Sequence, residues 1–405
     1  GGGAGGGDRK DPPSKSGDTD RVVAGTVLLK YGISPSRYAR LYRPLESSYP
    51  PPPTLEDLAP KGAGEGGGED AVMGEDGQQA GRGEMEVVML GTAASVPGKY
   101  RNVSGILVNH LAEGKGGILL DAGEGTLGQI HARYGPEKAR EVLESLRCVW
   151  ISHMHADHHI GLLRVLSHRA RLPGGGGKPL TVIGPVPLRK WLNAYKTVEA
   201  IEFEFVSNAK LGASAQWTGA DPEKLLADTE AGRLGVKIST VEVKHSCKHA
   251  CGVLVRAPPV PPLWQGWSVV YSGDTRPCEA LVGLGEGATL LIHEATFENG
   301  LEADARHKQH STTGEALEVG QRMHASRTLL THFSQRYAKC PVLSQVSNPG
   351  VPQGEGNTPA EPSAMVAFDL MTLNLADLAS LPSVLPAVEA LSAQEDWIDY
   401  REDVE

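Results

Sequence analysis

From Glu84 onward, short apolar runs alternate with polar segments rich in Gly, Pro, Asn and Asp, a pattern typical of buried β-strands. These runs predict strands at Val87–Leu90, Gly105–Val108, Gly117–Asp121, Cys148–Ser152, Leu180–Ile183, Val236–Val243, Trp267–Ser272, Ala288–His293 and Thr328–Thr331. Apolar residues at helical spacing lie between them and predict helices at Thr126–Tyr134, Pro136–Ser145, His159–Ala170, Pro187–Tyr195, Pro277–Val282 and Gly314–Met323. This alternation predicts mixed α/β layers in which helices pack outside sheets.

The two ends of the chain differ in composition from this central region. Residues 1–83 are rich in Gly and Pro and bury too little apolar surface to offset chain entropy, so we expect a mostly disordered lead. An apolar run within residues 21–45 predicts a strand and is interpreted as a remnant of an upstream domain. We expect one folded domain at residues 84–375 and an acidic tail at 376–405. The chain begins without Met, so we interpret it as a fragment of a longer protein, with a processed chain as the alternative.

The overall composition restricts the class of protein. Of the 405 residues, 40% are hydrophobic, which is enough for a substantial core. No stretch approaches the roughly 18 uninterrupted apolar residues that would span a bilayer, and the start lacks a signal-peptide pattern. We therefore expect an intracellular protein with no membrane partner, and we favour the nucleus or the mitochondrion over the cytoplasm and the plastid.

The cysteines and the net charge exclude further classes. The 5 cysteines are odd in number and form no paired CxxC motifs, so we interpret them as reduced thiols rather than a disulfide framework or a zinc ribbon. The formal net charge of −10 argues against non-specific coating of nucleic acid, which needs clustered Lys and Arg. Much of this charge lies in Glu65–Glu84 and Glu395–Glu405, so the folded region is closer to neutral.

The strongest chemical pattern is a histidine-rich segment directly after a predicted strand. Imidazole nitrogen and carboxylate oxygen are ligands that zinc accepts, and a single turn between strand and helix rarely needs so many histidines without a metal. We predict that the metal ligands of this segment are His153, His155, Asp157 and His158. His159 lies one step further into the helix, and we expect it to support its neighbours from behind.

The spacing HxHxDH resembles the metal-binding motif of the metallo-β-lactamase fold. The resemblance implies an αββα sandwich, two mixed sheets with helices on the outside, and further ligands at later strand ends. His245, Asp274 and His332 each directly follow a predicted strand. This placement puts all of them on one rim of the sheets.

Three more motifs narrow the resemblance to tRNase Z. Residues 97–102 match its PxKxRN loop, residues 293–296 match its HEAT motif, and residues 310–312 match its HST motif. The form HADHH of the first motif and the stretch His332–Lys339 are similar to the long eukaryotic form in particular. The region from Glu84 to Tyr337 thus resembles the carboxy-terminal catalytic half of long-form tRNase Z, with a weaker similarity at Val366–Leu373.

The resemblance implies a zinc-dependent endoribonuclease that removes the 3′ trailer from precursor tRNA and leaves a 3′-hydroxyl on the tRNA. It implies two zinc ions, between which a metal-bridged hydroxide attacks the phosphodiester. His153, His155 and His245 would hold one ion. Asp157, His158 and His332 would hold the other, with Asp274 bridging the two.

Other residues also receive catalytic roles. Asp157 would hold or accept the proton of the nucleophile, and Asp121 would orient the ligands from behind the metals. Glu294 and His310 would form a carboxylate–imidazolium pair that gives its proton to the departing ribose oxygen. The alternative for this pair is a buried polar contact that braces the sheet.

The PxKxRN loop, which begins at Pro97, is expected to bind the substrate. Lys99 and Arg101 offer cationic donors to phosphates near the acceptor end, and Asn102 can hydrogen-bond a base or sugar edge. A basic surface loop without this function is the alternative.

One departure from the family pattern concerns the third histidine ligand. An extra residue, Ser246, follows His245. Counting from the preceding strand favours His245 as the ligand, whereas counting back from Gly252 would place Ser246 there. We prefer the strand register, because backbone geometry fixes a strand end and a loop absorbs one residue more readily; His249 is the fallback.

A second departure is a missing substrate-binding arm. Gly184–Gly235 contains no Gly-rich, basic hairpin that could grip a tRNA elbow. In long forms this arm belongs to the amino-terminal half, so the expected partners are precursor tRNA and an amino-terminal half of the same longer protein. Two other functions remain open: another metallo-β-lactamase phosphodiesterase or RNA nuclease, and a catalytically inactive binding half. The three tRNase Z motifs disfavour the first, and the full ligand set disfavours the second.

Overall fold

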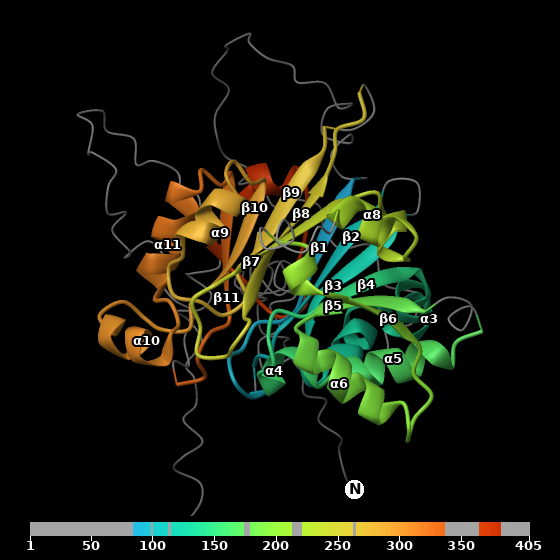
Figure 1. The fold of residues 1–405 in the computed structure, drawn as a ribbon. Coiled ribbons are helices and arrows are strands. Elements are labelled where there is room, and N and C mark those ends of the chain that lie inside the picture. Colours follow the sequence, from blue (N-terminus) through green and yellow to red (C-terminus); the bar gives the residue numbers. More distant parts are fainter. Residues whose placement is uncertain are drawn as a thin grey trace, which may run out of the picture.

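The computed structural model describes residues 84–98, 100–111, 115–173, 179–212, 221–261, 265–336 and 364–381. In this part of the molecule two β-sheets pack face to face, and helices cover the outer face of each sheet (Figure 1). The predicted αββα sandwich is therefore confirmed. The predicted lead, with its apolar run at 21–45, and the tail beyond residue 381 lie outside the described residues.

The first sheet is mixed, with strand order β13-β1-β2-β3-β4-β5-β6. Strands β13 to β3 of this order pair antiparallel, and β3 to β6 pair parallel. Its strands are β1 (Met85–Gly91), β2 (Gly105–His110), β3 (Gly116–Ala122), β4 (Leu146–Trp150), β5 (Leu180–Gly184), β6 (Phe203–Ser207) and β13 (Thr372–Asn374). Its outer face is covered by α3 (Thr126–Ser145), α5 (Leu162–Ala170) and α6 (Val186–Tyr195).

The second sheet is also mixed, with strand order β12-β11-β10-β9-β8-β7. Its strands are β7 (Lys237–Glu242), β8 (Cys251–Ala257), β9 (Trp267–Tyr271), β10 (Leu290–Glu294), β11 (Arg327–Thr331) and β12 (Ala364–Val366). Helices α9 (Glu279–Leu284) and α11 (Thr313–Arg322) cover its outer face. The other helices of the described residues are α4 (Ala156–His159), α8 (Pro222–Ala227), α10 (Glu302–Lys308) and the 3-10 helices η4 (Asn208–Lys210), η5 (Ala231–Leu234) and η7 (Ala376–Ala379). No helix within the described ranges has the length and apolar content needed to cross a membrane.

Alternate residues of the central strands face opposite layers. In β3, Ile118 and Leu120 point into the core between the sheets, whereas Leu119 packs against the outer helices. In β9, Tyr271 belongs to the inner core and Val270 to the outer one. Because both faces of these strands are buried, the sequence shows unbroken apolar runs there rather than an alternation of apolar and polar residues.

Two regions of the predicted helices contain a break. The predicted helices Thr126–Tyr134 and Pro136–Ser145 both form and share the label α3; they are separated where Gly135, with a φ of 74° and a ψ of 170°, is not helical. The predicted helix His159–Ala170 is instead divided into α4 and α5. A Cβ at Gly161 would lie 1.9 Å from the carbonyl oxygen of Gly123, so the division occurs where the backbone passes close to the end of β3.

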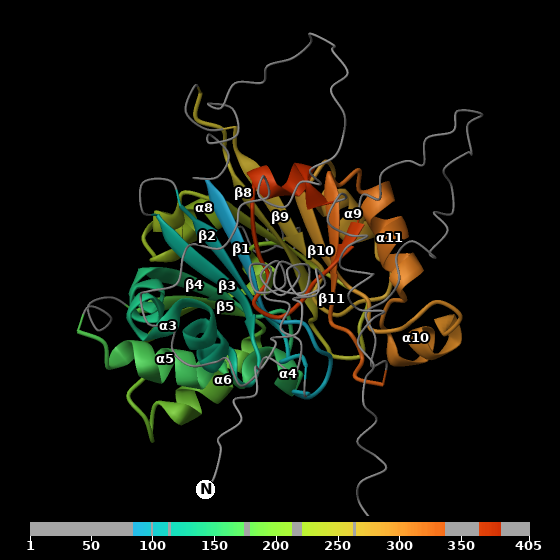
Figure 2. The ribbon, with the colours of Figure 1, turned by 180° about the vertical axis from the view of Figure 1, so that it is seen from behind.

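The C-terminal segment joins the two sheets. Its first strand, β12, pairs with β11 in the second sheet, and its second strand, β13, pairs with β1 in the first; Figure 2 shows this segment in red from behind. Beyond β13, Leu378 and Leu381 are buried in the core between the sheets. The packed chain therefore continues to Leu381, past the boundary expected at residue 375.

Candidate metal centre

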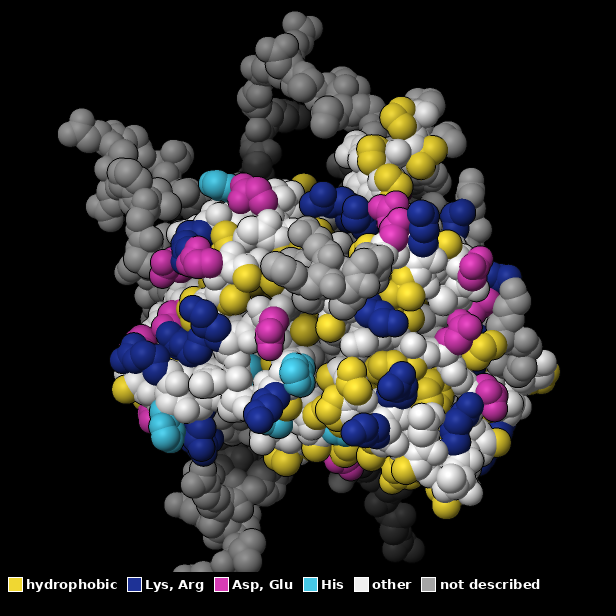
Figure 3. Space-filling model, in the orientation of Figure 1, with side chains coloured by type: hydrophobic (Ala, Val, Ile, Leu, Met, Phe, Trp, Pro, Cys, Tyr) yellow, Lys and Arg dark blue, Asp and Glu magenta, His cyan; other side chains and the backbone are white. Residues whose placement is uncertain are grey.

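The predicted ligands lie together where the two sheets meet. His153, His155, Asp157 and His158 follow the carboxyl end of β4 and enter α4. From the second sheet come residues that follow β7, β9 and β11, namely His245, Asp274 and His332. Figure 3 shows histidine side chains at the surface in the lower centre of this face, with Lys and Arg side chains beside them.

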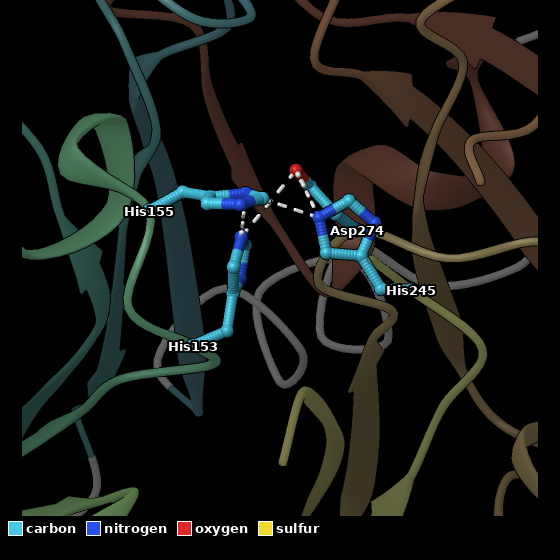
Figure 4. Close-up of side chains that lie close together, drawn as sticks. All are labelled: His153, His155, His245 and Asp274. Carbon is cyan, nitrogen blue, oxygen red and sulfur yellow. Dashed lines mark hydrogen bonds and ion pairs between the residues drawn. The ribbon is translucent and has the colours of Figure 1, made fainter. Parts of the chain in front are cut away.

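One group of ligand atoms is formed by His153, His155, His245 and Asp274 (Figure 4). The Nε2 atom of His153 lies 3.0 Å from Nδ1 of His155, which lies 3.1 Å from Nε2 of His245. Asp274 Oδ2 lies 3.6 Å from the Nε2 of His153 and 3.7 Å from that of His245. Tetrahedral zinc with bonds of roughly 2.0–2.1 Å separates its ligands by about 3.3 Å, so this spacing suits one ion.

A second group is formed by Asp157, His158 and His332. Asp157 Oδ2 lies 3.5 Å from Nε2 of His158 and 3.4 Å from Nε2 of His332. Asp274 borders this group as well, with Oδ2 3.3 Å from His158 Nε2 and Oδ1 3.3 Å from His332 Nε2. Asp274 therefore lies between both groups, in the position of a shared ligand.

Buried polar atoms without a partner support a metal at this place. Among the described residues, the buried atoms without a hydrogen bond include His158 Nε2, His332 Nε2 and Asp274 Oδ1. Buried polar groups in folded proteins are nearly always satisfied, and these three atoms face one another. A cation among them would satisfy all three, so the residues fit a metal ion.

The charge states of the ligands also suit a cation. Burial lowers the pKa of His153, His155 and His245, so these rings are neutral near pH 7 and present a lone pair. Burial alone would also lower the pKa of His158, but the surrounding carboxylates, Asp274 first, raise it well above its ordinary value. A metal ion and a proton compete for the same Nε2 lone pair, so metal binding would release this proton.

Asp121 holds the second group from behind. Its Oδ2 atom accepts hydrogen bonds from His158 Nδ1 at 2.7 Å, from the Tyr271 hydroxyl at 2.9 Å and from the Ser152 hydroxyl at 2.8 Å, and its Oδ1 atom accepts from the Ser152 amide at 2.7 Å. The bond to Nδ1 leaves Nε2 of His158 facing the centre. This geometry matches the role predicted for Asp121, whereas the contact of Tyr271 was not foreseen from the sequence.

His159 supports the first group rather than joining it. Its Nδ1 atom lies 2.8 Å from the carbonyl oxygen of His155. Its ring packs edge-on against Trp191, with 4.8 Å between the two ring centroids. The three residues considered for the third ligand differ in their positions. His245 reaches the centre, whereas Ser246 and His249 have exposed side chains and belong to none of the ligand groups found among the described residues.

A carboxylate–imidazole pair borders the metal centre. Glu294, at the end of β10, lies with Oε1 2.9 Å from Nδ1 of His310. The other oxygen of Glu294 accepts the Thr296 hydroxyl at 2.6 Å. Burial alone would lower the pKa of His310, but the Glu294 carboxylate raises it to about 9. His310 Nδ1 is 3.9 Å from Asp274 Oδ2, and His310, Asp274 and His332 form a third group that could hold a metal. Because Nδ1 of His310 lies closer to Glu294, at 2.9 Å, we interpret His310 as the partner of Glu294.

The PxKxRN loop begins at the exposed Pro97, and its Lys99 lies outside the described residues. The Nη1 atom of Arg101 donates to the Ala367 carbonyl oxygen and to the Thr92 hydroxyl, both at 2.7 Å. The side-chain amide of Asn102 donates to the Glu124 carbonyl oxygen at 2.8 Å. Both side chains therefore make contacts within the domain.

The segment just before this loop contacts Asp157, a candidate ligand of the metal centre. The backbone amide of Ser95 donates to Asp157 Oδ2 at 2.6 Å. Ser95 has a φ of 73°, an uncommon backbone conformation for a residue other than glycine. This contact could not be predicted from the sequence, because it depends on the path of the backbone and not on the type of side chain.

Two mixed sheets with histidine and aspartate ligands at their common rim define a recognisable class of protein. A family model described as β-lactamase superfamily domain matches residues 117–333 of the 405-residue chain, and the chain belongs to this superfamily.

Particular relatives are more informative. The chain is 40% identical over 351 residues to "tRNase Z TRZ3, mitochondrial" of Arabidopsis thaliana, covering 78% of this chain and 38% of that protein. It is 42% identical over 315 residues to "Zinc phosphodiesterase ELAC protein 2" of Homo sapiens, covering 76% and 35%. The crystal structure of a long form RNase Z from yeast superimposes with a TM-score of 0.60 at 27% identity, covering 76% and 44%. The chain thus spans less than half of the length of these relatives.

Proposed function

We propose that this chain is the catalytic part of a zinc-dependent endoribonuclease that removes the 3′ trailer from precursor tRNA. The observation that carries the proposal is the position of Asp274, shared between two ligand groups and 3.9 Å from the acid–base candidate His310. Paired metal sites of this kind serve phosphodiester hydrolysis. The names of the relatives, tRNase Z and zinc phosphodiesterase, support this reaction and this substrate.

The ligand groups are proposed to hold two zinc ions. His153, His155 and His245 would hold one ion, Asp157, His158 and His332 the other, and Asp274 would contact both. When bound, such a pair supplies Lewis acidity to the phosphate and lowers the pKa of a water molecule. Asp121 fixes the ring of His158 for this task through its bond to Nδ1.

The other residues of the site move protons. Asp157 is proposed to orient the attacking water and to accept its proton as the P–O bond forms. His310 is protonated near pH 7 because of Glu294, and it is proposed to give this proton to the departing ribose oxygen, which becomes the 3′-hydroxyl of the tRNA. Glu294 stabilises the imidazolium through its 2.9 Å hydrogen bond.

Substrate recognition is proposed to involve the PxKxRN loop and a second part of a longer protein. Lys99 and Asn102 would contact the acceptor end, and Pro97 shapes the loop. We propose residues 84–381 as the catalytic domain, preceded by the lead at 1–83 and assisted by an amino-terminal half that grips the tRNA. The Arabidopsis relatives are named mitochondrial, which supports the mitochondrion among the expected compartments.

The test compares two substrates after metal analysis of the purified chain. We expect close to two zinc ions per chain, cleavage of precursor tRNA at the 3′ end of the tRNA body, and cleavage of bis(p-nitrophenyl) phosphate. Cleavage of the diester alone would favour another phosphodiesterase of the superfamily. A chain that binds zinc but cleaves neither would be an inactive binding half, and a chain purified without chelator that holds no metal would refute the proposal.

A further inference from the structure

A half-buried acid outside the metal centre, Asp369, lies between β12 and β13. Its Oδ1 atom accepts the Thr92 hydroxyl at 2.7 Å. Its Oδ2 atom accepts the backbone amide of Asn102 at 2.5 Å and the side-chain amide of Gln129 at 2.9 Å. Two of these donors, at Thr92 and Asn102, are the two ends of the loop that contains the PxKxRN motif.

The side chain of Arg101 is held by the same C-terminal segment. Its guanidinium lies 4.7 Å from the ring centroid of Phe333 and 5.1 Å from that of Phe368. Its Nη1 atom donates to the carbonyl oxygen of Ala367, two residues before Asp369. The loop is thus fastened at Asn102 by a carboxylate and at Arg101 by two aromatic rings and a carbonyl.

The opposite end of the loop reaches the metal centre. The amide of Phe333, the residue after the ligand His332, donates to the carbonyl oxygen of Thr92 at 2.8 Å, and the amide of Ala94 donates to the carbonyl oxygen of Phe333 at 3.0 Å. The next residue, Ser95, donates its amide to Asp157. At this end the loop is therefore tied to the metal centre by backbone contacts that involve neither the Asp369 carboxylate nor the Arg101 side chain.

We propose that Asp369 is a positioning residue for RNA recognition: it holds the loop from Thr92 to Asn102 over the metal centre, with Arg101 as an anchor of this loop. The inference rests on the proposed function, since it assigns the loop to the RNA substrate. It revises the predicted role of Arg101 from a direct phosphate contact to an internal support. A lysine could not replace it, because the planar guanidinium both stacks and donates.

The hydrogen bonds around Asp369 suit a carboxylate better than an amide. Three donors converge on it, and a carboxylate offers about four lone-pair sites, whereas an asparagine would turn an NH2 group toward one of the donors. Desolvation of the carboxyl group raises the pKa of Asp369 to about 6, against the opposing effect of its hydrogen bonds. Val366, Met371 and Leu373 of the same segment are buried in the core, and Asp369→Asn leaves these apolar contacts in place.

The test uses Asp369→Asn with Asp377→Asn as the matched control. Asp377 is a buried acid of the same segment whose Oδ2 accepts the amide of Asn374 at 3.2 Å, remote from the loop. We expect Asp369→Asn to raise the KM for precursor tRNA about tenfold while kcat for bis(p-nitrophenyl) phosphate stays within about twofold, as for lost substrate positioning. Asp377→Asn should leave both substrates unchanged. Equal losses on both substrates, or none on either, would overturn the inference.

A double-mutant cycle and hydrogen exchange of the loop amides test whether Asp369 acts through the loop. In the Arg101→Gln background, Asp369→Asn should add little to the loss on tRNA, and simple additivity would contradict a shared role. Hydrogen exchange of the amides from Thr92 to Asn102 should accelerate in Asp369→Asn and not in Asp377→Asn. If Asp369→Asn does not fold, Thr92→Val removes one of its donors and should give a smaller effect of the same pattern. If the unchanged chain fails to cleave precursor tRNA, the proposed function fails, and the exchange experiment still decides whether Asp369 holds the loop.

Discussion

Nε2 of His245 lies 3.1 Å from Nδ1 of His155, although 90 residues separate them in the chain. The contact exists because the end of β7 and the turn after β4 meet at the same rim. His245 therefore lies at the candidate metal centre despite the extra Ser246 in the loop behind it, which favours the strand register for the third ligand.

His245→Ala should remove the third nitrogen from the first ligand group. We expect zinc content to fall by about one ion per chain and cleavage to fall on the order of 10²-fold or more, because metal stabilisation of the transition state is worth several kcal/mol. Metal analysis and initial rates on precursor tRNA measure both effects. His249→Ala is the matched control and should be mild; the reverse result would mean that the loop and not the strand selects the ligand.

Asp121→Asn should weaken metal binding without removing a ligand. The amide keeps the volume of the carboxylate but loses the charge that orients His158, and partners of this kind are worth about 10–100-fold in metal affinity. Competition with a chelator measures the affinity. If Asp121→Asn bound the metal as tightly as the unchanged chain, Asp121 would have a structural role only.

The pair of His310 and Glu294 predicts a pH dependence. A general acid must be protonated, so kcat should fall as pH rises through the pKa of His310, about 9 in this structure. Glu294→Gln removes the negative partner that raises this pKa, and the alkaline limb of the profile should move to lower pH. Single-turnover rates across the pH range test this, and a limb that stays in place would leave the pair as a structural brace.

Lys99 and Arg101 should affect RNA binding more than chemistry. Changing both to Ala is expected to impair cleavage of precursor tRNA while sparing bis(p-nitrophenyl) phosphate. Only Arg101→Ala should also lower the free energy of unfolding, by about 1–3 kcal/mol, because its donors and its stacking are internal. Urea unfolding of the two single variants separates the effects, and comparable losses on both substrates would reject the assignment.

An amino-terminal half supplied in trans should restore affinity more than the chemical step. The PxKxRN loop supplies only a few phosphate contacts, and tRNA binding at physiological salt needs several of them. We expect weak, salt-sensitive cleavage by the chain alone, and a lower KM with the added half. Single-turnover assays at two salt concentrations measure this. Tight, salt-insensitive binding by the chain alone would point to an RNA-binding surface within it.

The meeting of the candidate ligands could be predicted, because each of them follows an apolar strand and the strand ends lie at one rim of the sheets. The contacts of Asp369 and the internal contacts of Arg101 could not be predicted. Both depend on β13 pairing with β1, a contact between Glu86 and Asn374 that no local pattern encodes. Strand β6 was missed because it is half exposed and carries an acid among aromatic residues, and β8 because it begins directly after the loop of His245.

The candidate ligands come from both sheets, His153 and His158 from the first and His332 from the second. An ion held there would link the two layers of the sandwich, in addition to the apolar contacts between them. Metal binding and folding would then be coupled, because a metal that binds only the folded chain stabilises it by RT ln(1 + [M]/Kd). A cell that runs short of the metal would hold fewer folded molecules of this protein, and not only slower ones.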